Sequence, residues 1–208
     1  MPKVISPLQV AMAFGTPVST HLWPDSDDLN AGLRRLVLEA EAQGDGQSRS
    51  NVGGWHSVGE FLGQDAPEIA TLRQRIGDMA HDIIGMTGAD AAETPFRVRL
   101  TGWANVNRRG DYNQPHMHGG SIWSGVYYVS SGAPDDTDAL NGKLELFDPR
   151  PAAGFAVSRF APVAGKFTVD PIPGLMIFFP SWLSHMAHPF RGKGERISIA
   201  FNVAVEAA

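Results

Sequence analysis

The stretch RISIAFNVAVE, residues 196–206, alternates strictly between two kinds of side chain. A period of two predicts a β-strand whose two faces meet different surroundings. A face turned to bulk water normally carries longer charged side chains. One alternative for residues 196–204 is therefore an ordinary solvent face that happens to have few charges. Small polar side chains beside one arginine instead favour the inside of a barrel that leaves room for a ligand. The apolar face holds Ile197, Ile199, Phe201, Val203 and Val205, and the other holds Arg196, Ser198, Ala200, Asn202 and Ala204.

Further strand candidates surround this one from residue 96 onward. FRVRLTGWANVN (96–107) alternates in the same way, and Gly, Pro, Asp or Asn separate the segments that follow. The sequence therefore predicts a mainly β, antiparallel barrel or sandwich of jelly-roll type. We expect one domain over residues 1–208, in which 96–205 form the jelly-roll core.

The first 95 residues differ in texture and predict a helical flank. Residues 25–44 and 66–86 place apolar side chains at helical spacing, with acidic residues near the start of the first segment and a glycine, Gly44, at its end. Between them SNVGGWHS, residues 50–57, does not fit a helix. Its glycines and Trp55 suggest a lid-like loop over the barrel mouth.

Composition excludes several classes of protein. The chain has 208 residues, a formal net charge of −5 and no cysteine. Without cysteine a metal site must use histidine and carboxylate ligands, and the chain suits a reducing, cytoplasmic setting. The acidic balance argues against a nucleic-acid partner. No segment reaches the roughly 18 consecutive apolar residues that a membrane span needs, and the start lacks the basic region and long apolar run of a secretory signal.

The histidines are the candidate metal ligands. NQPHMHGG, residues 113–120, places His116 and His118 one residue apart, so that on an extended segment both rings project to one side. A durable site needs a third ligand, for which His185 and His188, after the strand candidate GLMIFFPSWLS, are available. The spacing alone is weak evidence, because such pairs also occur by chance.

The ordered set of segments is more specific. WANVNRRGDYNQPHMH, SGVYYV, LFDPRP, FPSWLSHMAHPF and RISIAFN follow one another between residues 96 and 205. In this order they resemble the 2-oxoglutarate- and Fe(II)-dependent oxygenases, in the branch similar to prolyl hydroxylases, and within it a bacterial and phage family of oxygenases. SNVGGWHS and the FGTPV near the start resemble that family more weakly. The resemblance implies a double-stranded β-helix, a cupin-like jelly-roll barrel, with flanking N-terminal helices.

The resemblance also implies roles for single residues. His116, His118 and His185 would hold Fe(2+), with His188 as a near neighbour of the site. Arg196 would grip the distal carboxylate of the cosubstrate 2-oxoglutarate. The residues that would help to bind this cosubstrate are Ser198, Tyr128, Asn107 and Asn105. The implied reaction hydroxylates a small-molecule or peptide substrate with release of succinate and carbon dioxide. Independently of the resemblance, a homodimer is the base-rate expectation for a bacterial enzyme of this size.

Physical chemistry supports this assignment and also marks one departure from it. Three protein ligands on one face leave positions for a chelating keto acid, and arginine is the bidentate choice for its other carboxylate. Arg196 could instead form a structural ion pair with Asp148 or Glu145.

The departure is His118, because the superfamily normally has a carboxylate there. If His118 is not a ligand, Asp111 or Asp148 would have to supply the carboxylate ligand. Three imidazoles leave open a cupin-like metalloenzyme, either a dioxygenase or an isomerase, that does not use 2-oxoglutarate. A non-catalytic metal-binding barrel is the third alternative.

Overall fold

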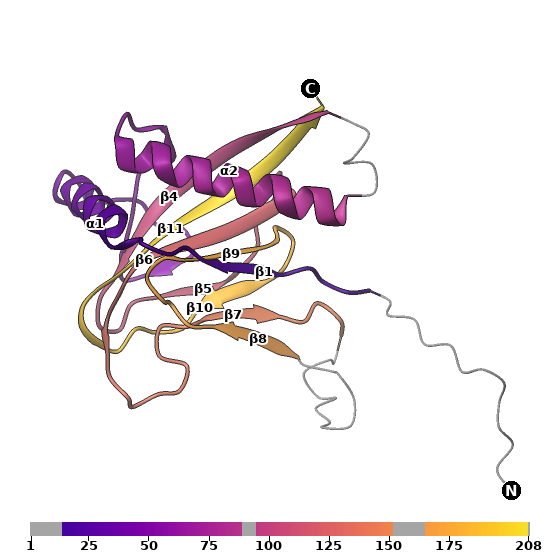
Figure 1. Ribbon diagram of the computed structural model, residues 1–208. Helices are drawn as coiled ribbons and strands as arrows, with labels where there is room; N and C mark the ends of the chain where they lie inside the picture. Colours follow the sequence, from indigo (N-terminus) through magenta and orange to yellow (C-terminus); the bar gives the residue numbers. More distant parts are fainter. Residues whose placement is uncertain (1–13, 89–94, 152–164, 208) are drawn as a thin grey trace, which may run out of the picture.

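The computed structural model describes residues 14–88, 95–151 and 165–207, and in this part of the chain two antiparallel sheets face each other (Figure 1). The larger sheet has the strand order β1-β9-β6-β11-β4-β3 and the smaller has the order β2-β5-β10-β7-β8. The larger sheet comprises β1 (Ser19–Leu22), β9 (Leu175–Pro180), β6 (Trp123–Pro134), β11 (Gly192–Ala207), β4 (Phe96–Asn107) and β3 (Trp55–His56). The smaller comprises β2 (Asn51–Val52), β5 (Tyr112–His116), β10 (His185–Ala187), β7 (Leu144–Phe147) and β8 (Lys166–Val169).

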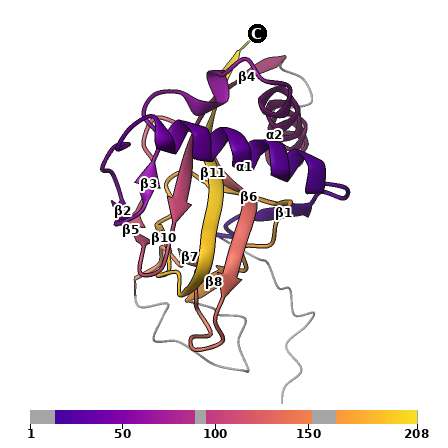
Figure 2. The same cartoon turned by 90° about the vertical axis from the view of Figure 1, so that its left-hand side faces the viewer.

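Two helices cover the outer face of the larger sheet. α1 (Asp27–Ala42) and α2 (Pro67–Thr87) both lie on the side away from the smaller sheet, and α1 crosses over β4, β11 and β6 (Figures 1 and 2). A short 3-10 helix, η1 (Phe61–Gly63), packs on β4. Pro67 suits the first turn of α2 because its missing N–H would have had no partner there. The expected helical flank is therefore present.

β11 is one of the two central strands of the larger sheet, and its two faces behave as its alternation predicts. Its apolar residues from Ile197 to Val203 are buried in one core cluster with Leu33, Leu72 and Ile76 of the helices. Its other face turns inward, where Arg196, Ser198 and Ala200 line a cavity between the sheets. The predicted mainly β, double-stranded β-helix fold is confirmed.

The segment expected to be a lid-like loop is paired into both sheets. Asn51 and Val52 pair with β5 of the smaller sheet, and Trp55 and His56 pair with β4 of the larger. Gly53 and Gly54 lie between the two short strands with φ of 63° and 52°, the left-handed region that glycine adopts without strain. This segment thus joins one edge of each sheet. Across the described ranges no helix has the length and apolar character to cross a membrane.

Candidate metal and cosubstrate site

Three histidine rings meet at one end of the cavity. His116 ends β5 and His185 opens β10, and the two are direct partners across these antiparallel strands. His118 lies two residues beyond β5, where its backbone N–H donates to the Ser181 carbonyl at 2.9 Å. The possible ligand nitrogens of the three rings all lie within 4.8 Å of one another. The ring centroids are 4.3 Å apart for His116 and His185, 5.0 Å for His116 and His118, and 5.2 Å for His118 and His185.

Backbone carbonyls orient two of these rings. His116 Nδ1 lies 2.7 Å from the Gln114 carbonyl, and His185 Nδ1 lies 2.9 Å from the Leu183 carbonyl. A carbonyl oxygen only accepts, so in both rings Nδ1 must carry the proton and donate. The lone pair is then on Nε2, the arrangement that metal-binding histidines adopt.

Burial keeps the three imidazoles neutral. It is the main cause that lowers the pKa of His116, that lowers the pKa of His118 to about 4, and that lowers the pKa of His185 to about 3. Repulsion from His116 lowers the last two further. Each ring can therefore offer a lone pair at neutral pH without first losing a proton.

The structure brings His185 to the cluster and takes His188 elsewhere. His188 Nε2 lies 3.2 Å from Glu145 Oε2, and Lys166 Nζ lies 2.8 Å from the other oxygen of the same carboxylate. The two aspartates considered as ligands are also engaged elsewhere, since Asp111 accepts from the Arg108 N–H at 2.7 Å and Asp148 pairs with Arg150. Within the described residues, the group that could hold a metal contains three histidines and no carboxylate.

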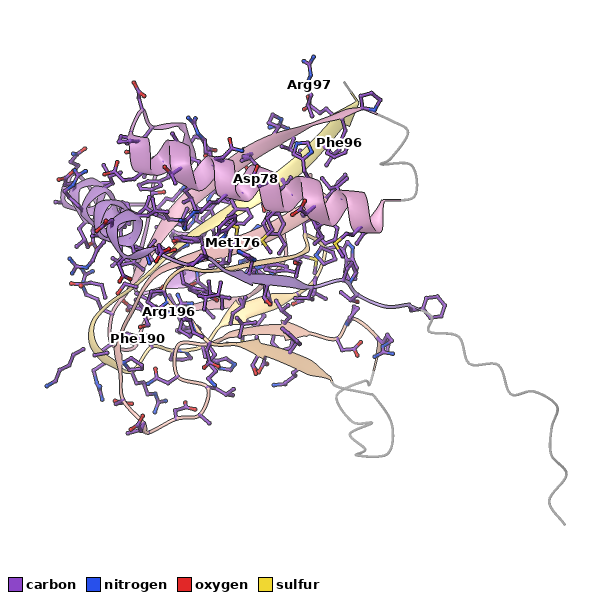
Figure 3. The ribbon with its side chains drawn as sticks, in the orientation of Figure 1. Asp78, Phe96, Arg97, Met176, Phe190 and Arg196 are labelled. Atoms are coloured by element: carbon purple, nitrogen blue, oxygen red, sulfur yellow. The ribbon has the colours of Figure 1, made fainter. Side chains whose placement is uncertain are left out.

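The residues expected at the keto acid come together on neighbouring strands of the larger sheet. Across the strands Arg196 is the partner of Asn107, and Ser198 is the partner of both Asn105 and Tyr128. Tyr128, Asn105, Arg196 and Ser198 line the same cavity as the histidines, and Arg196 lies between the two sheets (Figure 3). Asn107 supports the arginine, because its Oδ1 accepts from Arg196 Nη1 at 3.4 Å.

Among the described residues, Arg196 is a buried cation whose contacts are all neutral. It is 3% exposed, its Nε donates to the Gly142 carbonyl at 2.8 Å, and its guanidinium carbon lies 5.4 Å from the centre of the Tyr128 ring. Burial lowers its pKa. Neither structural pair considered from sequence is formed, since Asp148 pairs with Arg150 and Glu145 with Lys166. A buried charge without a counter-ion is costly, and a bound carboxylate would remove that cost.

Two further polar atoms in the cavity fit a polar ligand. The hydroxyl of Tyr128 and the Oδ1 atom of Asn105 are buried, and within the described part of the chain neither has a hydrogen-bond partner. Burial raises the pKa of Tyr128 to about 12, so its hydroxyl stays a donor at neutral pH. The donor set thus fits a divalent metal at the histidines and an anionic, hydrogen-bonding ligand that extends toward Arg196.

Sequence reasoning missed two residues, Ser50 and His56, that the segment containing β2 and β3 brings near the three histidines. Ser50 Oγ lies 3.4 Å from His116 Nε2 and accepts from Asn113 Nδ2 at 3.3 Å. His56 stacks almost parallel on Trp103, with 5.7 Å between the ring centres and 8° between the planes, and Trp103 lies 5.3 Å from His118. Ser50 and His56 both lie in the segment SNVGGWHS, which the sequence marked only as a whole, by its weaker resemblance to the family and its expected place over the barrel mouth.

The fold and the site define the class of protein: the 2-oxoglutarate- and Fe(II)-dependent oxygenases, enzymes whose cofactors are Fe(II) and 2-oxoglutarate. More narrowly, residues 101–202 match the family described as "Putative 2OG-Fe(II) oxygenase". This range contains every metal and cosubstrate residue expected from sequence, and the resemblance stated from sequence is confirmed. By sequence, no curated protein matches the chain.

Solved structures share the fold at low sequence identity. A prolyl-4-hydroxylase from Pseudomonas putida has a TM-score of 0.63 at 16% identity, covering 92% of this chain and 93% of that one. A viral collagen prolyl hydroxylase from Paramecium Bursaria Chlorella virus-1, solved as a 2OG complex, has a TM-score of 0.56 at 14% identity, covering 89% and 94%. A prolyl hydroxylase from Trichoplax adhaerens, in complex with a peptide fragment of the hypoxia inducible factor oxygen degradation domain, has a TM-score of 0.61 at 14% identity, covering 92% and 84%.

Proposed function

We propose that this chain is an oxygenase that uses dioxygen as the oxidant: one oxygen atom would hydroxylate an organic substrate, and the other would enter the succinate that forms, with carbon dioxide, from 2-oxoglutarate. His116, His118 and His185 would hold Fe(II), the first and third through their Nε2 atoms. Three protein ligands leave positions for the 1-carboxylate and 2-keto oxygen of the cosubstrate. When bound, the metal would activate dioxygen, which is the oxidant, and the keto acid would supply two of the four electrons that dioxygen takes up.

The chain's own residues would bind and orient the cosubstrate. Arg196 would donate two charge-assisted hydrogen bonds to the distal carboxylate, with Asn107 holding the guanidinium in place. Tyr128 and Ser198 would each donate a hydroxyl hydrogen bond, and Asn105 would contribute its amide group. The two facing sheets would exclude water from this contact.

The single observation that carries the proposal is the buried Arg196 in the same cavity as the histidines. An enzyme that uses the metal alone has no need for a cation there. The two structural explanations for Arg196 were ion pairs with Asp148 and with Glu145. Neither pair is formed, because these carboxylates contact Arg150 and Lys166 instead.

Anaerobic titration tests the proposal directly. Protein loaded with Fe(II) should develop the metal-to-ketoacid charge-transfer absorption when 2-oxoglutarate is added, and should release succinate when air is admitted. Absence of both signals in protein that holds stoichiometric iron would reject the proposal.

One observation favours a second candidate. The ligand group contains three imidazoles and, in the described ranges, no carboxylate. A three-histidine metalloenzyme that acts without 2-oxoglutarate would hold iron equally well and give neither signal in the titration.

The substrate class of the proposed oxygenase, a small molecule or a peptide, includes the peptide that the Trichoplax adhaerens protein binds.

A further inference from the structure

The lone pair of His116 has a hydrogen-bond partner within the chain. Nδ1 of this ring donates to the Gln114 carbonyl at 2.7 Å, so the lone pair is on Nε2. The Ser50 hydroxyl lies 3.4 Å from Nε2, and Asn113 Nδ2 donates to the hydroxyl oxygen at 3.3 Å. A nitrogen that carries a lone pair only accepts, so Ser50 must be the donor to it. The hydrogen bonds therefore run in one direction, from the Asn113 amide through Ser50 and His116 to a backbone carbonyl.

The backbone holds Ser50 in this position. Its carbonyl accepts from the Gln114 N–H at 2.8 Å, and the next residue, Asn51, pairs with Asn113 where β2 meets β5. Ser50, Asn113 and His116 all line the cavity. The serine is thus fixed to the strand that carries the first histidine, and its hydroxyl belongs to the site.

His116 differs in this respect from the other two candidate ligands. Within the described residues, the ring of His185 has its hydrogen bond to the Leu183 carbonyl and none to a hydroxyl, and the ring of His118 has no hydrogen bond. The hydroxyl is therefore a feature of one edge of the cavity, and it is not a general way in which the cluster is held together.

The Nε2 lone pair cannot serve the Ser50 hydroxyl and a metal at the same time. If the metal takes it, the hydroxyl keeps the Asn113 amide as its donor but loses its acceptor. A hydroxyl proton without an acceptor in a cavity shielded from water is costly, so a bound ligand has to supply the acceptor. The keto acid of the proposed reaction chelates the metal through its 1-carboxylate and so brings a charged acceptor to this end of the cavity.

We propose that Ser50, held by Asn113, is a further cosubstrate-binding residue, whose hydroxyl donates to the 1-carboxylate of 2-oxoglutarate once Nε2 of His116 holds the metal. This inference rests on the proposed function for the identity of the metal and the keto acid. Ser50 would fix the metal-side end of the cosubstrate, and Arg196 would fix the other end.

Magnetic resonance of protein prepared without metal tests the first half of the inference. With the histidine nitrogens isotopically labelled, the proton–nitrogen spectrum of the rings distinguishes a lone pair that accepts a hydrogen bond from one that does not. We expect the Nε2 signal of His116 to move to the second position in Ser50→Ala. It should stay in place in Ser50→Thr, which keeps a hydroxyl, and in Ser48→Ala, the matched control at an exposed position nearby.

Anaerobic titration of iron-loaded protein tests the second half. The charge-transfer absorption measures the affinity for 2-oxoglutarate and for pyruvate, which has the same carboxylate and keto group at the metal but no distal carboxylate. Loss of one hydrogen bond to a carboxylate should weaken both keto acids about tenfold in Ser50→Ala, while Ser50→Thr and Ser48→Ala keep the wild-type affinities. Arg196→Leu is the reference for the other end and should weaken 2-oxoglutarate alone.

An unmoved Nε2 signal in Ser50→Ala overturns the inference, and so does an unchanged affinity for 2-oxoglutarate. A loss that spares pyruvate also overturns it, because the hydroxyl would then act at the distal carboxylate. Ser50→Gly removes the same hydroxyl and decides in the same way if the alanine variant folds poorly.

Failure of the proposed function looks different from failure of this inference. Wild-type protein with stoichiometric iron would then show no charge-transfer absorption with either keto acid, while the Nε2 signal of His116 still reports its hydrogen bond to Ser50. If the wild type shows the absorption and Ser50→Ala binds both keto acids equally well, the proposed function stands and the role of Ser50 is rejected.

Discussion

At the scale of single residues, strand register places His185 rather than His188 beside the other two candidate ligands. His185 is paired across from His116, whereas His188, three residues later, faces the Glu145 carboxylate. We therefore expect His185→Ala to lose most of the bound iron and His188→Ala to keep it. Elemental analysis of protein loaded anaerobically checks this. Stoichiometric iron in His185→Ala together with depleted iron in His188→Ala would reverse the assignment.

The hold on 2-oxoglutarate is a second property of single residues. If Arg196 forms two charge-assisted hydrogen bonds, each contributing about 1.5–3 kcal/mol, Arg196→Leu should weaken keto-acid binding by two orders of magnitude or more. Arg196→Lys should recover only part of this, because an ammonium group cannot reproduce the planar fork. Ser198→Ala removes one hydrogen bond and should cost about tenfold.

Titration of the charge-transfer absorption measures all three affinities, and iron content serves as the control. Neither Arg196 nor Ser198 belongs to the candidate metal group, so iron binding should not change in any of the three proteins. Unaltered keto-acid affinity in Arg196→Leu would place the distal carboxylate elsewhere.

At the scale of elements, the close packing of β6 against β9 and β11 depends on a glycine. A Cβ atom at Gly125 would lie 2.4 Å from the Ile177 carbonyl oxygen and 2.4 Å from the Phe201 ring. Neither neighbour is the free end of a flexible chain, so the strands would have to move apart. Gly125→Ala should lower the free energy of unfolding by about 1–3 kcal/mol.

The matched control for this prediction is Gly85→Ala in α2, where a Cβ would meet nothing within 4 Å. Alanine there should stabilise the protein by roughly 0.5–1 kcal/mol, because glycine is a poor helix former. Urea denaturation measures both changes. A Gly125→Ala protein as stable as the wild type would mean that the sheet adjusts at no cost.

At the scale of the whole molecule, stability should depend on pH through Glu145. Burial raises the pKa of this carboxyl, but hydrogen bonds and attraction from Lys166 and His188 outweigh burial and hold it below its ordinary value. A folded-state pKa below the unfolded one gives stability that is present above the unfolded pKa and is lost as the pH falls through the folded one.

Wild-type protein should therefore lose stability below about pH 4.5, where unfolded glutamate begins to take up protons. Glu145→Gln should be less stable than wild type at neutral pH and should lose less as the pH falls. Thermal unfolding across this pH range compares the two proteins. Parallel curves for them would exclude Glu145 as a source of the pH dependence.

Much of this molecule could be predicted from its sequence because the informative patterns are local. The alternation of β4 and β11 and the helical stripes of the N-terminal half each reflect one buried face, and those faces meet in one core cluster. The strands β2, β3 and β10 could not be predicted, since two or three residues carry no period. Their existence depends on partners far along the chain, and so do the placements of Ser50 and Asn113 beside His116.

The pairing of His116 with His185 has a consequence for unfolding. The two rings lie on adjacent strands whose positions are far apart in the chain, so one bound ion would join β5 to β10 as a removable cross-link. A ligand that binds only the folded state stabilises it by an amount that grows with its free concentration, about 2.7 kcal/mol at one hundred times the dissociation constant. Backbone amides of β5 and β10 should accordingly exchange with deuterated water more slowly as the metal concentration rises. The folded lifetime of this barrel would then depend on how much metal its surroundings supply.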